Sequence, residues 1–130
     1  MFKRSVLIAE DDPVLRNLYQ KKFSIAQYDI RTAENGEEVL QQLDDRYPDV
    51  LVLDIHMPKM DGFDVLEKLS TTGRPFPVIM LTNFADERSR ERSKELGANG
   101  YFVKKDMTIR ALLDTVDRAA LRWKELDTNA

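Results

Sequence analysis

The sequence predicts an α/β domain built on a doubly wound, five-stranded parallel sheet. Two observations predict it: short continuous apolar runs at residues 6–9, 50–53 and 78–81, and helical periodicities in the segments between them. Apolar runs of this length, rich in β-branched residues and ended by polar ones, are typical of strands buried on both faces. Strands that alternate with helices form parallel βαβ units with right-handed crossovers.

Weaker sequence patterns indicate the remaining strands and the ends of the helices. Two further strands are expected at residues 29–33 and 101–103. Pro13 suits the first turn of the first helix, after the acidic Asp12, and Gly97 suits the position just past the fourth. The last helix has the clearest pattern, because its apolar residues keep to one face. The five helices are expected around residues 14–23, 39–43, 65–69, 85–96 and 109–123.

Length and composition favour one globular domain. The chain has 130 residues, of which 42% are apolar and 33% charged, which suits a single soluble domain rather than two or a disordered segment. We expect its core to span about residues 4–122. Residues 123–130 would form the end of the last helix and a short polar tail.

Several classes of function are disfavoured by composition. The chain has no cysteine, which excludes disulfides and thiolate metal sites. Its apolar runs are far shorter than a membrane span and no secretory signal precedes them, so we expect a cytoplasmic protein without a membrane partner. The net charge of −3 gives no electrostatic basis for direct binding of nucleic acid.

Polar residues stand where the predicted strands end. Glu10 and Asp11 follow the first strand, Asp54 the third, Thr82 the fourth and Lys104 the fifth. The carboxyl ends of parallel strands meet at one edge of the sheet, where such folds place their sites. Taken singly, these residues are ordinary caps or solvated charges, and Asp12 before Pro13 is best explained as a helix cap. Their joint placement predicts a site.

This combination of residues indicates phosphoryl transfer. Three converging carboxylates repel one another unless a cation lies between them. Oxygen ligands without histidine or cysteine favour Mg²⁺, which also recruits phosphate oxygens. A hydroxyl from Thr82 and a positive charge from Lys104 complete the groups that position a phosphoryl group and stabilise its charge.

Four motifs together resemble the receiver domain of two-component response regulators. They are LIAEDD at residues 7–12, LDIHMPKMDG at 53–62, MLT at 80–82 and GYFVK at 100–104. The resemblance covers about residues 4–122 and is specific because the order and spacing of all four motifs are kept. It implies a flavodoxin-like fold with strand order 2-1-3-4-5 and five helices.

The resemblance also implies a role for each residue of the acidic site. Asp54 would be the phosphoacceptor. Asp11 and Asp54 would bind Mg²⁺ directly, together with the backbone carbonyl of His56, and Glu10 would act through water. The domain would not turn over an external substrate, apart from phosphorylating itself from a phosphodonor and dephosphorylating itself.

The resemblance further implies how the phosphoryl group is detected. Lys104 would pair with Asp54 and then with a phosphoryl oxygen. Thr82 would bind the phosphoryl group, and Tyr101 would turn inward to fill the space that Thr82 vacates. Pro58 and Gly62 would shape the loop after the acceptor strand.

The resemblance implies partners of two kinds. A histidine kinase or a phosphotransfer protein would supply the phosphoryl group. A downstream partner would bind the face formed by the fourth helix, the fifth strand and the fifth helix, and the domain would be a monomer or a phosphorylation-dependent dimer. The residues specify neither the kinase nor the output, nor whether the chain is a complete regulator or part of a longer one.

The fourth helix has a thin apolar stripe and like-charged residues four apart, so we expect it to be loosely held.

Three residues depart from the pattern of the family. Asn83 follows Thr82 where a smaller residue is usual, and His56 stands at a position that tunes the lifetime of the phosphoryl group. Lys105 replaces the usual proline after Lys104. A cis bond before a residue other than proline costs about 2.5–4 kcal/mol, so we expect a trans Lys104–Lys105 bond. The loop should then lead into a helix capped by Thr108, with Asp106 as the second choice.

Two other functions use similar residues. A phosphatase of the haloacid dehalogenase type also combines a strand-end aspartate, Mg²⁺, a threonine and a lysine. It needs a second aspartate two residues after the nucleophile, however, where this chain has His56. A receiver-like binding module that is never phosphorylated is the third alternative, but such modules typically lack part of the acidic set that is complete here.

Overall fold

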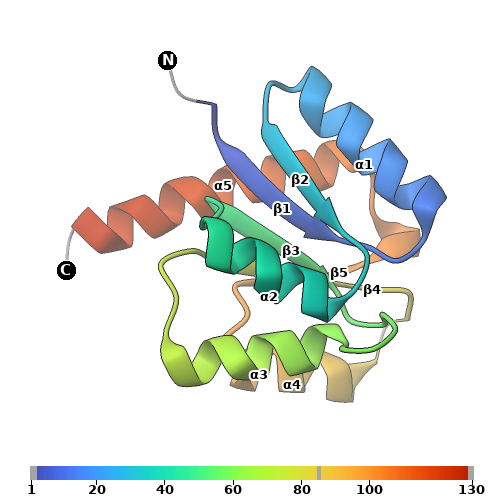
Figure 1. Ribbon diagram of the computed structural model, residues 1–130, viewed down its shortest axis with the longest axis vertical. Helices are drawn as coiled ribbons and strands as arrows, with labels where there is room; N and C mark the ends of the chain where they lie inside the picture. Colours follow the sequence, from blue (N-terminus) through green and yellow to red (C-terminus); the bar gives the residue numbers. More distant parts are fainter. Residues whose placement is uncertain (1–2, 85, 129–130) are drawn as a thin grey trace.

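A computed structural model describes residues 3–84 and 86–128. Its centre is a sheet of five parallel strands in the order β2-β1-β3-β4-β5 (Figure 1). The predicted sheet is therefore confirmed. The strands are β1 (Ser5–Ala9), β2 (Asp29–Ala33), β3 (Val50–Asp54), β4 (Val78–Thr82) and β5 (Gly100–Val103).

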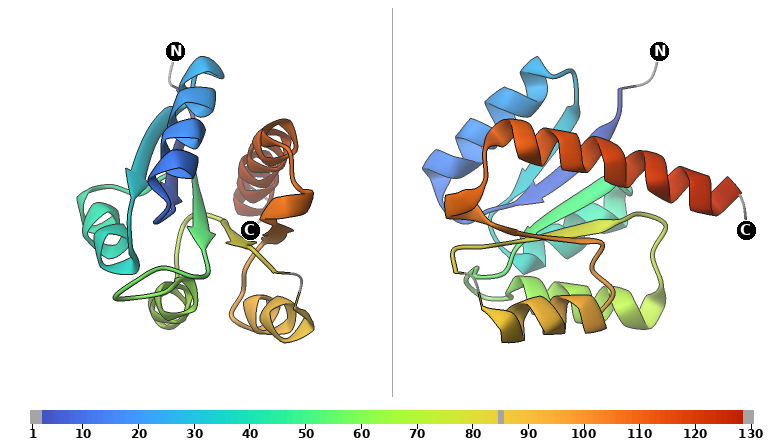
Figure 2. Two further views of the ribbon diagram at one scale, coloured as in Figure 1. Left: turned by 90° about the vertical axis from the view of Figure 1, so that its right-hand side faces the viewer. Right: turned by 180° about the vertical axis from the view of Figure 1, so that it is seen from behind.

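Five α-helices cover the two faces of this sheet. Helices α1 and α5 lie on one face, and α2, α3 and α4 on the other (Figure 2). None of the helices within residues 3–84 and 86–128 is both long and apolar enough to cross a membrane. The helices are α1 (Pro13–Ile25), α2 (Gly36–Asp45), α3 (Gly62–Thr72), α4 (Glu87–Glu95) and α5 (Ile109–Thr128).

The continuous apolar runs are explained by two cores, one on each face of the sheet. Val52 of β3 joins the cluster under α1 and α5, whereas its neighbours Leu51 and Leu53 join the cluster under α2 and α3. Successive side chains of a strand point to opposite faces, so a strand covered on both sides needs apolar residues at every position.

The ends of the helices follow the capping signals of the sequence. Asp12 Oδ1 accepts a hydrogen bond from the backbone N–H of Val14 at 2.9 Å, and Pro13 takes the first helical position of α1. Gly97, with φ of 91°, ends α4 in the left-handed region, where glycine is favoured over other residues. The predictions for these three residues are confirmed.

The connection from β5 to α5 is also as expected. All peptide bonds of the described residues are trans, including Lys104–Lys105. A short 3₁₀ helix, Lys104–Asp106, leads into α5. Thr108 Oγ1 accepts a hydrogen bond from the N–H of Ala111 at 3.1 Å, so Thr108 rather than Asp106 caps the helix.

The prediction for the fourth helix needs correction. Helix α4 begins at Glu87 rather than at residue 85, because Asp86 accepts a hydrogen bond from the N–H of Arg88 and so acts as its cap. Ala85 lies outside the described residues. The buried residue of α4 is Ser93.

The far end of the sheet carries the single tryptophan, Trp123 of α5. Trp123 lines one cavity with Asp49 and Pro75, residues that stand just before β3 and β4. The guanidinium of Arg74 lies 5.7 Å from the centre of its ring. Arg74 also donates hydrogen bonds to the carbonyl of Gly97 and to Asn99 Oδ1, which links the tryptophan to the segment between α4 and β5.

Candidate phosphoacceptor site

Strand register brings the predicted site residues to one edge of the sheet. Ala9 at the end of β1 pairs with Leu53, Asp54 pairs with Leu81, and Thr82 pairs with Val103. Glu10, Asp54, Thr82 and Lys104 therefore all stand at or just beyond paired strand ends. This convergence follows from the parallel topology, as predicted from the positions of these residues in the sequence.

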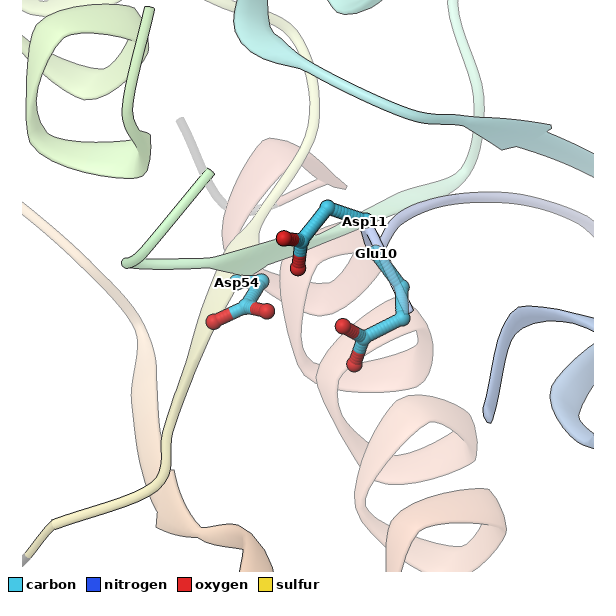
Figure 3. A group of neighbouring side chains, drawn as sticks. All are labelled: Glu10, Asp11 and Asp54. Carbon is cyan, nitrogen blue, oxygen red and sulfur yellow. The ribbon is translucent and has the colours of Figure 1, made fainter. Parts of the chain in front are cut away.

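Three carboxylates form what we call the acidic cluster: Glu10, Asp11 and Asp54. One carboxylate oxygen from each residue lies within 4.8 Å of those of the other two. Asp54 rises from the end of β3, while Glu10 and Asp11 come from the loop after β1, and the three carboxylates face a common space (Figure 3). Glu10 and Asp54 are buried and Asp11 is exposed.

Lys104 lies between the two buried carboxylates. Its Nζ donates a hydrogen bond to Asp54 Oδ2 at 2.8 Å and lies 2.6 Å from Glu10 Oε1 in an ion pair without hydrogen-bond geometry. Burial by itself lowers the pKa of Lys104, but the hydrogen bond to Asp54 and the negative charges of Asp54 and Glu10 more than offset this and raise it. Lys104 is therefore held as a cation against Asp54.

The carboxylate of Glu10 has a raised pKa. Burial raises the pKa of Glu10 to about 7, and the nearby carboxylate of Asp54 adds to the rise, whereas Lys104 opposes it. The second oxygen, Oε2, accepts a hydrogen bond from the N–H of Asp12 at 3.3 Å. The cluster thus carries more negative charge than one lysine balances.

The donor set fits a magnesium ion. All three side chains of the acidic cluster offer carboxylate oxygens, and Mg²⁺ prefers oxygen ligands and typically takes one or two carboxylates together with water. The exposed position of Asp11 leaves one side of the cluster open to solvent.

Thr82 and Tyr101 occupy different environments. Thr82 is buried, and its Oγ1 accepts a hydrogen bond from the N–H of Phe84 at 3.3 Å. Tyr101 packs against the core under α2 and α3, with the guanidinium of Arg90 lying 4.7 Å from the centre of its ring. Its buried hydroxyl has no hydrogen-bond partner among the described residues.

The loop after β3 packs closely against the end of β3. The N–H of His56 donates to Asp54 Oδ1 at 3.2 Å, while the side chain of His56, like Pro58, is exposed. The N–H of Gly62 donates to the carbonyl of Ile55 at 2.9 Å. A Cβ on Gly62 would lie 2.5 Å from the carbonyl oxygen of Asp54, so any larger residue there displaces the end of β3.

Comparison with known proteins agrees with this geometry. Residues 6–117 match the family described as "Response regulator receiver domain". The chain belongs to this family. It is therefore a response regulator receiver domain of two-component systems, a signalling module rather than a conventional enzyme. Because the chain belongs to the receiver family, the match argues against the alternative of a haloacid dehalogenase-type phosphatase.

Named relatives extend the comparison. The chain is 36% identical over 126 residues to the "Probable transcriptional regulator ycf27" of Porphyridium aerugineum, covering 92% of this chain and 52% of that protein. It is 35% identical over 101 residues to the "Alkaline phosphatase synthesis transcriptional regulatory protein PhoP" of Bacillus subtilis, covering 78% of this chain and 42% of that protein. This receiver domain thus spans about half the length of the curated relatives it matches.

Solved structures share the fold. A CheY-like receiver domain protein from Methanospirillum hungatei superposes with a TM-score of 0.88 at 22% identity, covering 95% of this chain and 98% of that one. The chemotaxis protein CheY4 of Vibrio cholerae gives a TM-score of 0.83 at 28% identity, covering 91% and 99%. The flavodoxin-like architecture expected from the sequence is confirmed.

Two residues near the site of this receiver domain were not expected from the sequence. Arg16 of α1 donates to the backbone carbonyls of Glu10 and Asp11 at 3.1 and 3.3 Å and so fixes the acidic loop. Tyr19 is buried on the same helix, and burial, with the charge of Glu10, raises the pKa of its phenol to about 12. The only signal for Arg16 is its place one turn into a helix that follows the acidic residues.

The perturbed pKa of Glu10 predicts how pH affects the stability of the metal-free domain. Because the folded pKa of about 7 exceeds that of the unfolded chain, the folded state binds more protons between the two values. This contribution to stability is present at low pH and is lost as pH rises from about 4.5 to 7. The full loss is about 3.5 kcal/mol, because the folded pKa of about 7 lies about 2.5 units above the ordinary value and each unit is worth about 1.4 kcal/mol.

Urea unfolding in the presence of EDTA measures this effect. Between pH 5 and pH 8 the Glu10→Gln variant should gain about 2–3 kcal/mol relative to wild type, because it cannot ionise. Glu91→Gln, at an exposed position on α4, is the matched control and should follow wild type. A constant difference between Glu10→Gln and wild type across this range would contradict the raised pKa.

Proposed function

We propose that this receiver domain is a phosphorylation-dependent switch that accepts a phosphoryl group on Asp54. The observation that carries the proposal is the position of Asp54, at the end of β3, hydrogen-bonded to Lys104 and within the acidic cluster. Nucleophile, cation and candidate metal ligands therefore meet at one point that faces solvent through Asp11. A histidine kinase or a phosphotransfer protein supplies the phosphoryl group.

The chemistry follows from these contacts. A carboxylate oxygen of Asp54 attacks the phosphorus of a phosphohistidine, and the new O–P bond forms as the N–P bond breaks. The imidazole nitrogen leaves with the bonding electron pair. Lys104 keeps its positive charge beside the acceptor and moves from the carboxylate to a phosphoryl oxygen. Such transfers require positioning and charge stabilisation rather than further covalent chemistry by the protein.

Mg²⁺ is the proposed cofactor of this reaction. Asp11, Asp54 and the backbone carbonyl of His56 would hold the ion, and Glu10 would act through water. When bound, the ion neutralises charge on the phosphoryl oxygens. Without it, the cluster relies on Lys104 and on the proton of Glu10 to limit carboxylate repulsion.

Apolar side chains beside the site suggest where the phosphodonor protein binds. Val14 and Leu18 lie one turn apart on α1 and are 74% and 37% exposed. Helix α1 begins directly after the acidic loop, so a partner helix that covers this apolar strip would also reach Asp54. We propose that output passes to a downstream protein partner, with the domain a monomer or a phosphorylation-dependent dimer and without direct contact to nucleic acid.

Intact-mass measurement tests the proposal. The domain is incubated with Mg²⁺ and acetyl phosphate, and a mass increase of one phosphoryl group is expected for the wild type. No increase under any concentration of donor and Mg²⁺ would favour the alternative of a receiver-like module that is never phosphorylated.

Thr82→Ala separates switching from chemistry. The substitution leaves Asp54, Lys104 and the candidate metal ligands in place but removes the hydroxyl proposed to bind the phosphoryl group. We expect phosphorylation at a reduced but measurable rate, together with loss of the active conformation. Intact mass measures the rate of phosphorylation, and the amide chemical shifts of β5 and α4 measure the change to the active conformation. Thr82→Ser, which keeps the hydroxyl, is the control. Normal switching by the alanine variant would rule out this role.

A further inference from the structure

A cavity lies at the end of the sheet opposite to the acidic cluster. The last turns of α5 project beyond the amino-terminal ends of the strands (Figure 1), and they line one side of a hollow of about 460 Å³. Trp123 and Leu126 of α5 face this hollow together with Arg74 and Pro75, which stand shortly before β4. Cavities of this size are typical of sites for small organic molecules.

The wall that α5 gives to the cavity is apolar. Leu126 is 61% exposed and Trp123 is half-buried. Both side chains also line a second hollow of about 370 Å³, which they share with Pro77 and Ala119. Large apolar side chains that remain exposed around a hollow are the usual lining of a site for an apolar molecule.

The polar side of the cavity is a guanidinium without a counter-ion. Arg74 is half-buried and forms no ion pair within the part of the chain that the structure describes. Burial lowers the pKa of Arg74, and no neighbouring carboxylate offsets this effect. Its Nε is also buried without a hydrogen-bond partner among the described residues. By contrast, the partly buried Arg4, Arg16 and Lys104 each pair with a carboxylate, as buried charges normally do.

Contacts with uncharged groups hold Arg74 in position. Its Nη2 donates hydrogen bonds to the carbonyl of Gly97 and to Asn99 Oδ1 at 2.9 Å, and its guanidinium lies 5.7 Å from the ring centre of Trp123. Asn99 Oδ1 is fixed in turn by the N–H of Val78, at 2.9 Å. These contacts orient the guanidinium but leave its charge unbalanced. A side chain that is already fixed loses little freedom when a ligand binds.

The other charged side chains of the lining also favour an anion. They are Asp49 and Lys124. Asp49 Oδ2 accepts a hydrogen bond from the backbone N–H of Ser5 at 2.8 Å, so this carboxylate is engaged by β1 and not by Arg74. With two basic side chains and one acidic one, the lining is positive, whereas the whole chain has a net charge of −3.

We propose that this cavity binds a small organic anion, with an apolar body against Trp123 and Leu126 and a carboxylate that faces Arg74. The ligand supplies the counter-charge that the chain itself does not give to Arg74. A hollow of this size suits a small molecule, because stable protein partners need a much broader contact surface. The site lies at the opposite end of the strands from Asp54, so binding requires neither Mg²⁺ nor a phosphoryl group.

Titration of the whole chain with 4-phenylbutyrate tests the proposal, in the absence of Mg²⁺ and of any phosphodonor. The indole N–H resonance of Trp123, the single tryptophan, reports occupation of the cavity. The matched ligand is 4-phenylbutanol, which keeps the phenyl ring and the alkyl chain but has no charge. The carboxylate should bind about tenfold more tightly than the alcohol, because hydrogen bonds between charged groups are the stronger ones.

Three variants separate the charge of Arg74 from its structural contacts. Arg74→Met keeps an extended side chain without the charge, so the preference for the carboxylate should disappear. Arg74→Lys keeps the charge but not the planar fork, so a reduced preference should remain. Arg110→Met makes the same chemical change as Arg74→Met at an exposed position in the first turn of α5, outside the cavity, and should bind both ligands as the wild type does.

A variant of the apolar wall completes the test. Leu126→Gln, at an exposed position, should weaken both ligands by about threefold through lost apolar contact, and it should keep the preference for the carboxylate. Equal affinity of the wild type for the two ligands would overturn the proposal, even if Arg74→Met did not fold. So would an indole resonance that neither ligand shifts.

Occupation of the cavity by a second copy of the chain is distinguished in the same experiment. In that case the indole resonance of the ligand-free chain would shift with protein concentration, and this result would also overturn the proposal. Phosphorylation of Asp54 is measured separately by intact mass. Failure of that reaction contradicts the proposed function and leaves the anion site in place, whereas failure of the titration contradicts the anion site alone.

Discussion

Replacing Asp54 by asparagine is expected to abolish phosphorylation completely. Asparagine keeps the size of the side chain but removes the anionic oxygens that attack phosphorus, and no other carboxylate of the cluster has the same contacts. Asp54 alone is both hydrogen-bonded to Lys104 and within reach of the N–H of His56. Intact mass after incubation with Mg²⁺ and acetyl phosphate should show no phosphorylated species.

The matched control for this variant is Asp12→Asn. Asp12 stands next to the acidic cluster, and its role is to cap α1 through the N–H of Val14. Asparagine caps helices as well as aspartate does, so the control should fold and phosphorylate normally. Phosphorylation of Asp54→Asn at the wild-type level would place the acceptor elsewhere.

Asp11→Ala is expected to remove Mg²⁺ binding as well as phosphorylation. Asp11 is the exposed member of the acidic cluster and makes no side-chain hydrogen bond among those found in the described residues, so its loss should leave the fold intact. In wild type, Mg²⁺ at about 100 times its Kd should stabilise the fold by about 2.7 kcal/mol through mass action. The variant should show none of this stabilisation.

Thermal unfolding with and without Mg²⁺ measures the effect without any phosphodonor. Asp12→Asn again serves as the control, because it removes a neighbouring negative charge without removing a candidate ligand. A variant Asp11→Ala that keeps the wild-type shift in Tm would show that our assignment of metal ligands is wrong, even if phosphorylation of Asp54 were established.

The sequence was most informative where periodicity and topology combine. Buried strands are recognisable as continuous apolar runs, and a parallel sheet must bring their ends together, so the positions of Asp54 and Thr82 followed from local pattern alone. The caps Asp12 and Thr108 followed from their chemistry. The trans bond before Lys105 followed from the energy of the peptide bond.

Other features depend on contacts between segments far apart in the chain, and the sequence could not show them. The closeness of Gly62 to the carbonyl of Asp54 requires the path of the loop. The stacking of Arg90 on Tyr101 joins a helix to a strand that follows it, and no local pattern distinguishes such an arginine from a solvated one. Helix α4 begins later than predicted because the side chain of Asp86 caps it, so that the first helical residue is Glu87.

The position of Trp123 decides what intrinsic fluorescence can report. Trp123 lines a cavity beyond the amino-terminal ends of the strands, together with Pro75 and Asp49, whereas the acidic cluster lies at their carboxyl ends, roughly 15 Å away for strands that rise about 3.3 Å per residue. A cation in the cluster is too distant to quench the indole by contact. Arg74 instead connects the ring to Gly97 at the end of α4. The fluorescence of Trp123 therefore reports on the segment that joins α4 to β5, through Arg74, and not on the acidic cluster.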